Sequence, residues 1–173
     1  MCVTPEMSGM STRSTESDRA AALIASLQLQ PHPEGGWYRE VFRSAQTVLP
    51  QDGQAPRAAL TTIDFLLRRG QFSAWHRVLG DEVWHLLEGE GLKLWLLPPD
   101  PLPGLVAQQV LLSVDSTRRH VVPSGWWQAA EPLGDFAYVG ATVGPGFDFA
   151  DFSFGRDDAA LLAALQLDLK RLL

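Results

Sequence analysis

The segment Gly70–Gly89, GQFSAWHRVLGDEVWHLLEG, decides the fold. His76 follows the first glycine by six residues, Glu82 follows His76 by another six, and the second glycine comes seven residues later. Residues 79–81, Leu-Gly-Asp, favour a turn, so one strand should end near His76 and the next should begin at Glu82. The sequence therefore predicts a strand-turn-strand unit in which an imidazole and a carboxylate face each other.

Further short strands flank this segment on both sides. Alternation of apolar and polar residues between turn signals predicts strands over 37–43, 57–67, 92–97, 106–112, 118–122, 126–129 and 136–143. Helical spacing of apolar residues predicts a helix over 18–29 that packs outside a sheet, and a second helix over 157–173 with Asp157 as its cap. Many short strands at this spacing are typical of an all-β sandwich or barrel.

Composition limits the class of protein. The chain of 173 residues suits one domain over 18–173, preceded by a Ser-, Thr- and Met-rich tail over 1–17 that we expect to be disordered. Net charge is −6 without a basic stripe, so nucleic acid is not an expected partner. No apolar run suggests a membrane span, and no secretory signal is visible. Because Cys2 is the single cysteine, no internal disulfide is expected, and we predict a cytoplasmic protein.

The central segment resembles the first of two motifs of the cupin superfamily. Gly70, His76, Glu82 and Gly89 match that motif, whereas Val78 stands where it has a second metal-binding histidine. The second motif resembles PSGWWQ at 123–128, where Gln128 replaces a third histidine, Thr117 the opening glycine and Pro132 the closing asparagine; these three positions are departures from the motif.

Three further strings resemble one branch of the superfamily, a domain of unknown function. They are PHPEGGWYRE at 31–40, DEVWH at 81–85 and PGFDFADF at 145–152. The resemblance covers about residues 20–170 and implies a cupin-type β-sandwich, or jelly-roll barrel, with short flanking helices at both termini. It also implies a homodimer, but it leaves the reaction open, because a fold does not define a function.

Metal binding is one alternative. The resemblance implies that a metal-binding cupin presents three histidines and one glutamate, of which His76 and Glu82 remain here. We therefore expect no cofactor; a divalent metal, if bound, would use His76, Glu82 and Gln128. His85 could join them only if a β-bulge reversed the strand register, and the simplest interpretation places Trp84 inside the barrel and His85 outside.

Proton transfer is the other alternative. Without a metal, His76 can act as a base while Glu82 holds its tautomer, chemistry that the resemblance to sugar-modifying cupins associates with epimerases and isomerases. The hypothesis is that the barrel binds a small polar, sugar-like molecule and that the protein is a metal-independent epimerase, isomerase or lyase. A non-catalytic binding module is the alternative.

Additional ligand-binding candidates surround these two residues. They are Gln128, Trp84, Trp126, His85 and Tyr38. Trp75, Trp84, Trp126 and Trp127 flank the motifs, and such rings serve either as ligand platforms or as core residues.

Other polar residues have simpler interpretations. For His32 and Glu34 a helix-to-strand turn is favoured over a loop at the pocket mouth. His120 is predicted to lie on the surface, and structural roles are favoured for Asp148 and Asp151.

Overall fold

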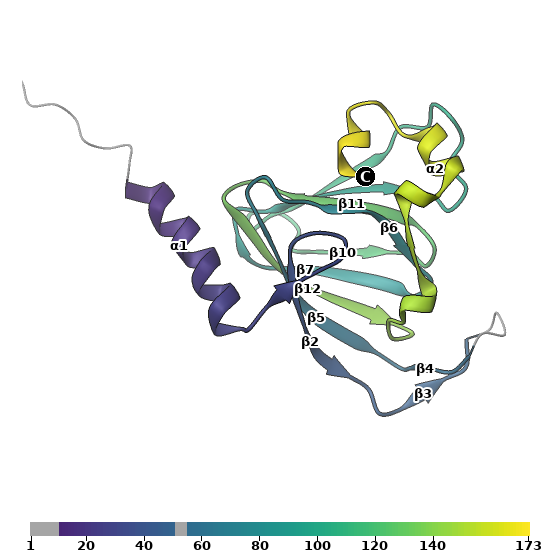
Figure 1. Ribbon diagram of the computed structural model, residues 1–173, viewed down its shortest axis with the longest axis horizontal. Helices are drawn as coiled ribbons and strands as arrows, with labels where there is room; N and C mark the ends of the chain where they lie inside the picture. The colour runs from purple at the N-terminus through teal and green to yellow at the C-terminus, as the bar shows by residue number, and fades with distance from the viewer. Residues whose placement is uncertain (1–10, 51–54) are drawn as a thin grey trace, which may run out of the picture.

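The computed structural model describes residues 11–50 and 55–173, which form two antiparallel sheets with helical segments outside them (Figure 1). The six-stranded sheet contains, in spatial order, β1 (Gln30–Pro31), β2 (Trp37–Arg43), β5 (Thr61–Arg68), β12 (Phe136–Gly144), β7 (Asp81–Gly89) and β10 (Arg119–Val122). The five-stranded sheet contains β13 (Phe152–Phe154), β6 (Ser73–Val78), β11 (Trp127–Pro132), β8 (Leu92–Leu97) and β9 (Gln108–Leu112). The predicted all-β sandwich is confirmed.

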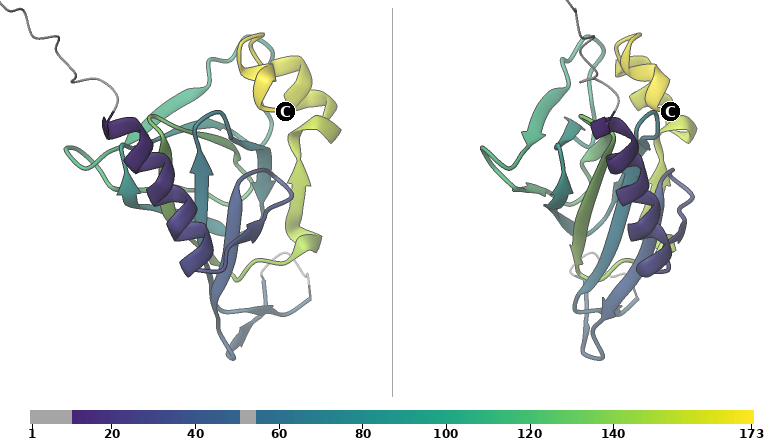
Figure 2. Two further views of the ribbon diagram at one scale, coloured as in Figure 1. Left: turned by 60° about the vertical axis from the view of Figure 1, so that its left-hand side comes forward. Right: turned by 90° about the vertical axis from the view of Figure 1, so that its left-hand side faces the viewer.

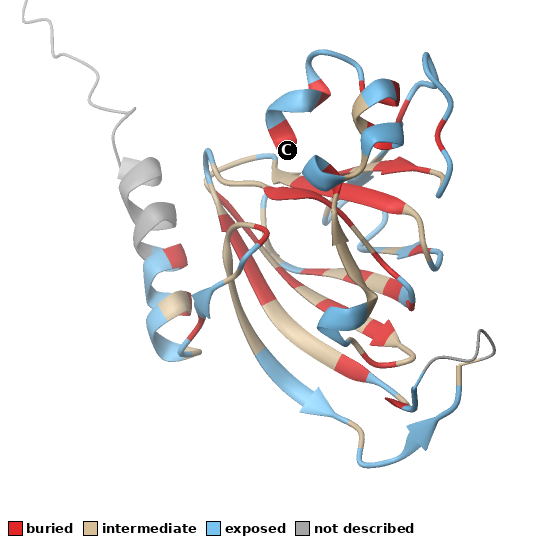
Figure 3. Ribbon diagram, turned by 45° about the vertical axis from the view of Figure 1, so that its right-hand side comes forward, coloured by how far each residue is buried: buried red, intermediate tan, exposed pale blue. Residues whose placement is uncertain are grey.

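Apolar side chains of both sheets meet in one core between them. Phe65, Trp84 and Val139 of the six-stranded sheet pack with Leu94 and Leu96 of the five-stranded sheet. Buried residues accordingly concentrate along the strands, whereas the end of β2 and the residues at 47–48 are exposed (Figure 3). The strands therefore form a rigid frame for any site that lies between the sheets.

The predicted strand over 57–67 is interrupted. Its first residues form β4 (Arg57–Ala58), which pairs with β3 (Thr47–Val48), while the remainder forms β5. Between the two strands, the N–H of Ser44 donates to the carbonyl of Leu60 and the N–H of Ala59 donates to the carbonyl of Gln46. These two bonds connect the β3–β4 pair to the β2–β5 pair. This small hairpin lies apart from the main sheets (Figure 1).

The N-terminal helix begins earlier than predicted. Helix α1 (Ser11–Ser26) includes residues 11–17, so this part of the predicted disordered tail is helical, and residues 1–10 lie outside the described residues. Its buried Ala20 and Leu23 pack with Leu66 and Phe136 on the outer face of the six-stranded sheet (Figure 2). The predicted packing against a sheet is therefore observed.

The prediction of one continuous C-terminal helix is wrong. After η1 (Phe149–Asp151) and η2 (Gly155–Asp157) come α2 (Ala159–Ala164) and η3 (Leu169–Leu172). Asp158, not Asp157, caps α2 by accepting a hydrogen bond from the N–H of Leu161 at 2.8 Å. The backbone becomes extended at Leu165, which ends α2. The leucines at helical spacing are nevertheless buried, because both short helices pack on the outside of the five-stranded sheet.

None of the helices in the described ranges is long and apolar enough to cross a membrane.

Candidate active site in the barrel cavity

His76 and Glu82 lie on different sheets and line the same cavity. His76 belongs to β6 and Glu82 to β7, and both side chains are almost completely buried. The cavity has a volume of about 350 Å³ and lies between the sheets and the segment that follows β12. The turn at residues 79–80 joins the two strands, so the central segment supplies both groups, as its spacing predicts.

Hydrogen bonding fixes the tautomer of His76. Its Nδ1 lies 2.8 Å from the carbonyl oxygen of Ala74. Because a carbonyl only accepts, Nδ1 carries the hydrogen, and Nε2 of the neutral ring has a free lone pair. The ring of Phe152 stacks on the imidazole at 5.5 Å with an interplanar angle of 15°. Burial lowers the pKa of His76, although the nearby Glu82 acts in the opposite direction.

Glu34 lies beside that lone pair. Its Oε2 is 3.3 Å from Nε2 of His76, and its Oε1 accepts a hydrogen bond from the Ser73 hydroxyl at 2.8 Å. Burial raises the pKa of Glu34 while it lowers that of His76, so the two proton affinities approach each other. A proton between Nε2 and Oε2 makes this contact favourable, and we infer that the pair shares one proton.

Two glycines position Glu34. Gly35 and Gly36 have φ angles of 111° and 70°, and a Cβ atom on Gly35 would lie 2.1 Å from the carbonyl oxygen of Phe72. The N–H of Ala74 donates to the carbonyl of Glu34 at 2.8 Å, which ties this loop to β6. The interpretation of the segment as a simple turn was incomplete, because the turn places Glu34 in the cavity.

The same loop brings His32 to the cavity wall beside Tyr38. Nδ1 of His32 accepts a hydrogen bond from the N–H of Glu34 at 3.3 Å, so the neutral ring carries its hydrogen on Nε2. The ring of Tyr38 meets it edge-on at 4.5 Å. Burial lowers the pKa of His32, which favours this neutral form.

Glu82 is held by a hydrogen-bonded chain that crosses from sheet to sheet. Nε1 of Trp84 donates to Oε1 of Gln128 at 2.8 Å, and Nε2 of Gln128 donates to Oε2 of Glu82. Because an indole N–H can only donate, it fixes the amide with its NH₂ group towards Glu82. Burial, the largest cause, raises the pKa of Glu82 to about 7; Glu34 acts in the same direction, whereas His76 and Gln128 oppose it.

These contacts correct the expected role of Glu82. We expected its carboxylate to hold the His76 tautomer, but the Ala74 carbonyl holds Nδ1 and Glu34 contacts Nε2. Glu82 instead faces the cavity as a separate group with its own donor, Gln128. Gln128 lies opposite His76 in the β6–β11 pairing, so the two side chains share the inner face.

The structure brings only some of the other candidates to the cavity. Tyr38 lines it, whereas Gln128 and Trp84 lie behind Glu82 and Trp126 packs against the core. His85 lies opposite Arg119 on the outer face of β7, because the bulge in the β7–β12 pairing comes only after Leu86. His85 therefore does not reach Glu82.

His120 is only half-buried in β10.

The residues at the four positions that bind a metal ion in a metal-binding cupin do not form such a site here. Val78 contributes only apolar surface to the cavity. The Gln128 oxygen is bound to Trp84, so an amide NH₂ group points where a ligand atom would be needed. Within residues 11–50 and 55–173, no three His, Cys, Asp or Glu side chains are arranged to hold a metal.

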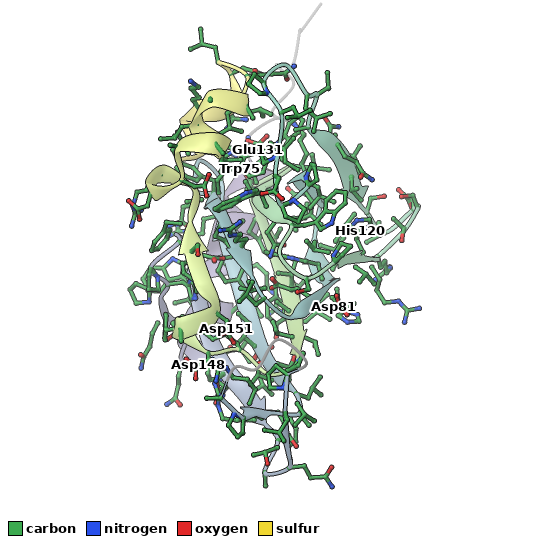
Figure 4. All side chains as sticks on the ribbon, turned by 90° about the vertical axis from the view of Figure 1, so that its right-hand side faces the viewer. Trp75, Asp81, His120, Glu131, Asp148 and Asp151 are labelled. Atoms are coloured by element: carbon green, nitrogen blue, oxygen red, sulfur yellow. The ribbon has the colours of Figure 1, made fainter. Side chains whose placement is uncertain are left out.

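Asp148 and Asp151 lie on the segment after β12, away from Trp75 and Glu131 (Figure 4). Asp151 forms a bidentate ion pair with Arg57, with oxygens 2.7 and 2.8 Å from Nε and Nη2. Asp148 caps η1 by accepting from the N–H of Ala150 at 2.9 Å, and it also lines the cavity. Both residues have structural contacts, and Asp148 is in addition part of the cavity wall.

Two antiparallel sheets that enclose a buried histidine and glutamate define a cupin. A family model described as Cupin superfamily (DUF985) matches residues 21–155, and the chain belongs to this family.

Solved structures agree with this assignment. A hypothetical protein from Leishmania major is 34% identical, with a TM-score of 0.70 over 78% of this chain and 85% of that one. A protein from Shewanella oneidensis is 29% identical, with a TM-score of 0.67 over 85% and 97% of the two chains. The capsular polysaccharide assembling protein CapF from Staphylococcus aureus is 15% identical with a TM-score of 0.53 over 73% of this chain and 31% of that one, so it shares the fold alone. No protein of curated function matches the chain.

Proposed function

We propose that this cupin is a metal-independent enzyme that moves a proton on a small polar molecule bound in the cavity, as an epimerase, isomerase or lyase does. The observation that carries the proposal is the 3.3 Å contact between Nε2 of His76 and Oε2 of Glu34, in a cavity that Glu82 also lines. Paired titratable groups with shifted pKa values in a cavity are characteristic of acid–base sites.

The pair and the single carboxyl group take different roles. Glu34 and His76 together form the base, because Ala74 and Ser73 orient them and their pKa values approach each other. Glu82, with a pKa raised to about 7, is the acid. A catalytic group whose pKa lies near the working pH is the most effective in proton transfer.

The reaction begins at a C–H bond next to a carbonyl. The Glu34 carboxylate takes the proton while the shared proton stays on Nε2 of His76, the C–H electron pair forms the C=C bond of an enol, and the carbonyl oxygen takes the proton of Glu82. For an isomer, a proton returns to the former carbonyl carbon while the hydroxyl group on the neighbouring carbon gives up its proton to Glu82 and becomes the new carbonyl. For an epimer, a proton returns to the opposite face of the same carbon while the enol oxygen gives its proton back to Glu82. In a lyase reaction the enol oxygen would return its proton to Glu82 as the C=O bond re-forms, the C=C bond would move to the β-carbon, and the β-hydroxyl group would leave as water with that proton. Every route uses the same base, Glu34 with His76, and the same acid, Glu82.

Solvent exchange tests this proposal without knowledge of the product. The protein, treated with a chelator, would be incubated in D₂O with a panel of aldoses and ketoses, and deuterium at the carbon next to the carbonyl would be followed by NMR. We expect exchange with the wild-type protein, and loss of it in His76→Gln and Glu82→Gln. His85→Gln is the matched control, because His85 lies on the outer face. Binding of a sugar without any exchange would overturn the proposal in favour of a binding module.

A further inference from the structure

The cavity wall carries more acidic than basic side chains. Four carboxyl groups line it, namely Glu34, Glu40, Glu82 and Asp148. Arg43 is the one Lys or Arg among the described residues that line it. Glu82 is ionised above its pKa of about 7, so above that pH an anionic substrate next to it would be repelled.

Each nitrogen of Arg43 already donates a hydrogen bond within the protein. Its Nε and Nη2 donate to the two oxygens of Glu40 at 3.1 and 2.7 Å, and its Nη1 donates to the carbonyl oxygen of Phe147 at 3.1 Å. A carboxylate or phosphate that binds the Nε and Nη2 edge of this guanidinium group would have to displace Glu40. The next arginine along this rim, Arg57, is committed to Asp151 in a bidentate pair.

Aromatic rings complete the wall next to these carboxyl groups. Phe147, Phe149 and Phe152 come from one short segment, and the first two meet edge-on with their centroids 5.0 Å apart. Ring faces pack on the C–H surfaces of a hydroxylated ring, while carboxyl groups accept hydrogen bonds from its hydroxyl groups. The volume of about 350 Å³ is near the lower limit of roughly 300–1,000 Å³ for small-molecule sites, which suits one such ring.

We propose that the substrate is a hydroxylated molecule of about one ring that carries no anionic group, and is therefore neutral or amino-substituted. This inference rests on the proposed function and narrows it, because sugar phosphates, sugar acids and nucleotide sugars are excluded. The carboxyl groups of the cavity wall and the pairing of Arg43 with Glu40 carry it.

A charge-matched panel tests the substrate class. Hexoses of several ring configurations would each be used as the neutral sugar, the 2-amino sugar, the uronate and the 1-phosphate, with binding measured by calorimetry at pH 8. We expect at least one neutral or amino sugar to bind about tenfold or more tightly than its anionic counterparts, a difference of about 1.4 kcal/mol. Equal or tighter binding of the anionic forms would overturn the inference, and so would binding of none of the probes.

A charge variant identifies the cause. Glu40→Gln releases two nitrogens of Arg43, so binding of the uronate or phosphate should improve by about tenfold relative to the neutral sugar. Glu88→Gln is the matched control, since Glu88 pairs with Arg19 outside the cavity, and it should leave the ratio unchanged. An unchanged ratio in Glu40→Gln would contradict the role of Arg43. Deuterium exchange on an anionic sugar would refute the inference about substrate charge and leave the proposed reaction standing. Tight binding of a neutral sugar without deuterium exchange would refute only the proposed reaction.

Discussion

Nε2 of His76 lies 3.3 Å from Oε2 of Glu34, although the two residues come from separate segments of the chain. The contact requires a proton between the two atoms, because Nδ1 of His76 is already committed as a donor to Ala74. This pair, rather than His76 with Glu82, is the base in the proposed reaction, and the first prediction follows from it.

Glu34→Gln should lower the rate of deuterium exchange by about a hundredfold or more, within the range for loss of one general acid–base group. The amide can still accept from Ser73, so the loop should keep its position. Exchange rates and circular dichroism of the variant and the wild type are the measurements. A normal rate in a folded variant would exclude Glu34 from the base.

The raised pKa of Glu82 makes stability depend on pH. The folded state binds the Glu82 proton up to about pH 7, whereas the unfolded chain loses it near its ordinary value of 4.5. Its contribution to the free energy of unfolding is therefore complete below pH 4.5 and is lost as the pH rises to 7, by about 3 kcal/mol in total. The difference between wild type and Glu82→Gln in denaturant unfolding should change by that amount between pH 4.5 and 8. His76 acts in the opposite sense, since its lowered pKa favours folding as the pH rises towards 6.5. A difference independent of pH would show that Glu82 has an ordinary pKa.

Gln128→Ala should destabilise the protein by about 2–4 kcal/mol, because it leaves both Trp84 Nε1 and the Glu82 carboxyl group without their partner and creates a void. Trp84→Phe removes only one of these bonds and should cost less. The measurement is chemical denaturation at constant pH. Equal stability of Gln128→Ala and the wild type would mean that the chain between the sheets does not form.

Gly35→Ala should destabilise the loop and also reduce exchange. Its φ of 111° disfavours a side chain, and the added Cβ would lie 2.1 Å from the Phe72 carbonyl oxygen. Gly70→Ala is the control, because Gly70 also has a positive φ, of 79°, but its Cβ would meet nothing within 4 Å. Gly70→Ala should cost only about 1 kcal/mol and retain activity. Similar losses in both variants would assign the effect to backbone strain alone.

Added iron, manganese, nickel or zinc should not raise the Tm of the wild-type protein. A metal ion raises the Tm only if it binds the folded state, and we expect no such binding. The donor set explains this expectation, since Gln128 presents its NH₂ group and Val78 has no ligand atom. Thermal melts together with elemental analysis of the purified protein are the check. About one metal ion per chain with a raised Tm would contradict it.

Motif spacing and alternation were sufficient to predict the sandwich and the burial of His76 and Glu82. Gln128 could be placed on the inner face, but its amide orientation depends on Trp84, a contact between strands of different sheets. Such contacts depend on register, which spacing along one strand does not reveal.

The role of Glu34 could not be predicted from local pattern alone. The two glycines after it indicated an unusual backbone, but only the packing of that loop against β6 shows that the carboxyl group points inwards. The prediction of one continuous helix over 157–173 was wrong for a related reason. The leucines do have helical spacing, but two short helices with the extended residue Leu165 between them bury these side chains against the sheet.

The chain of bonds from Trp84 through Gln128 to Glu82 has a consequence for how the family can diverge. The same two hydrogen bonds join the two sheets, and the one from Gln128 to Glu82 lowers the pKa of Glu82 against the larger, opposite effect of burial. Gln128 takes part in both bonds, so we expect a substitution there to be accompanied by a change at Trp84 or Glu82. Among related sequences these three positions should therefore vary together, and a histidine in place of Gln128 should be accompanied by a different residue at the position of Trp84.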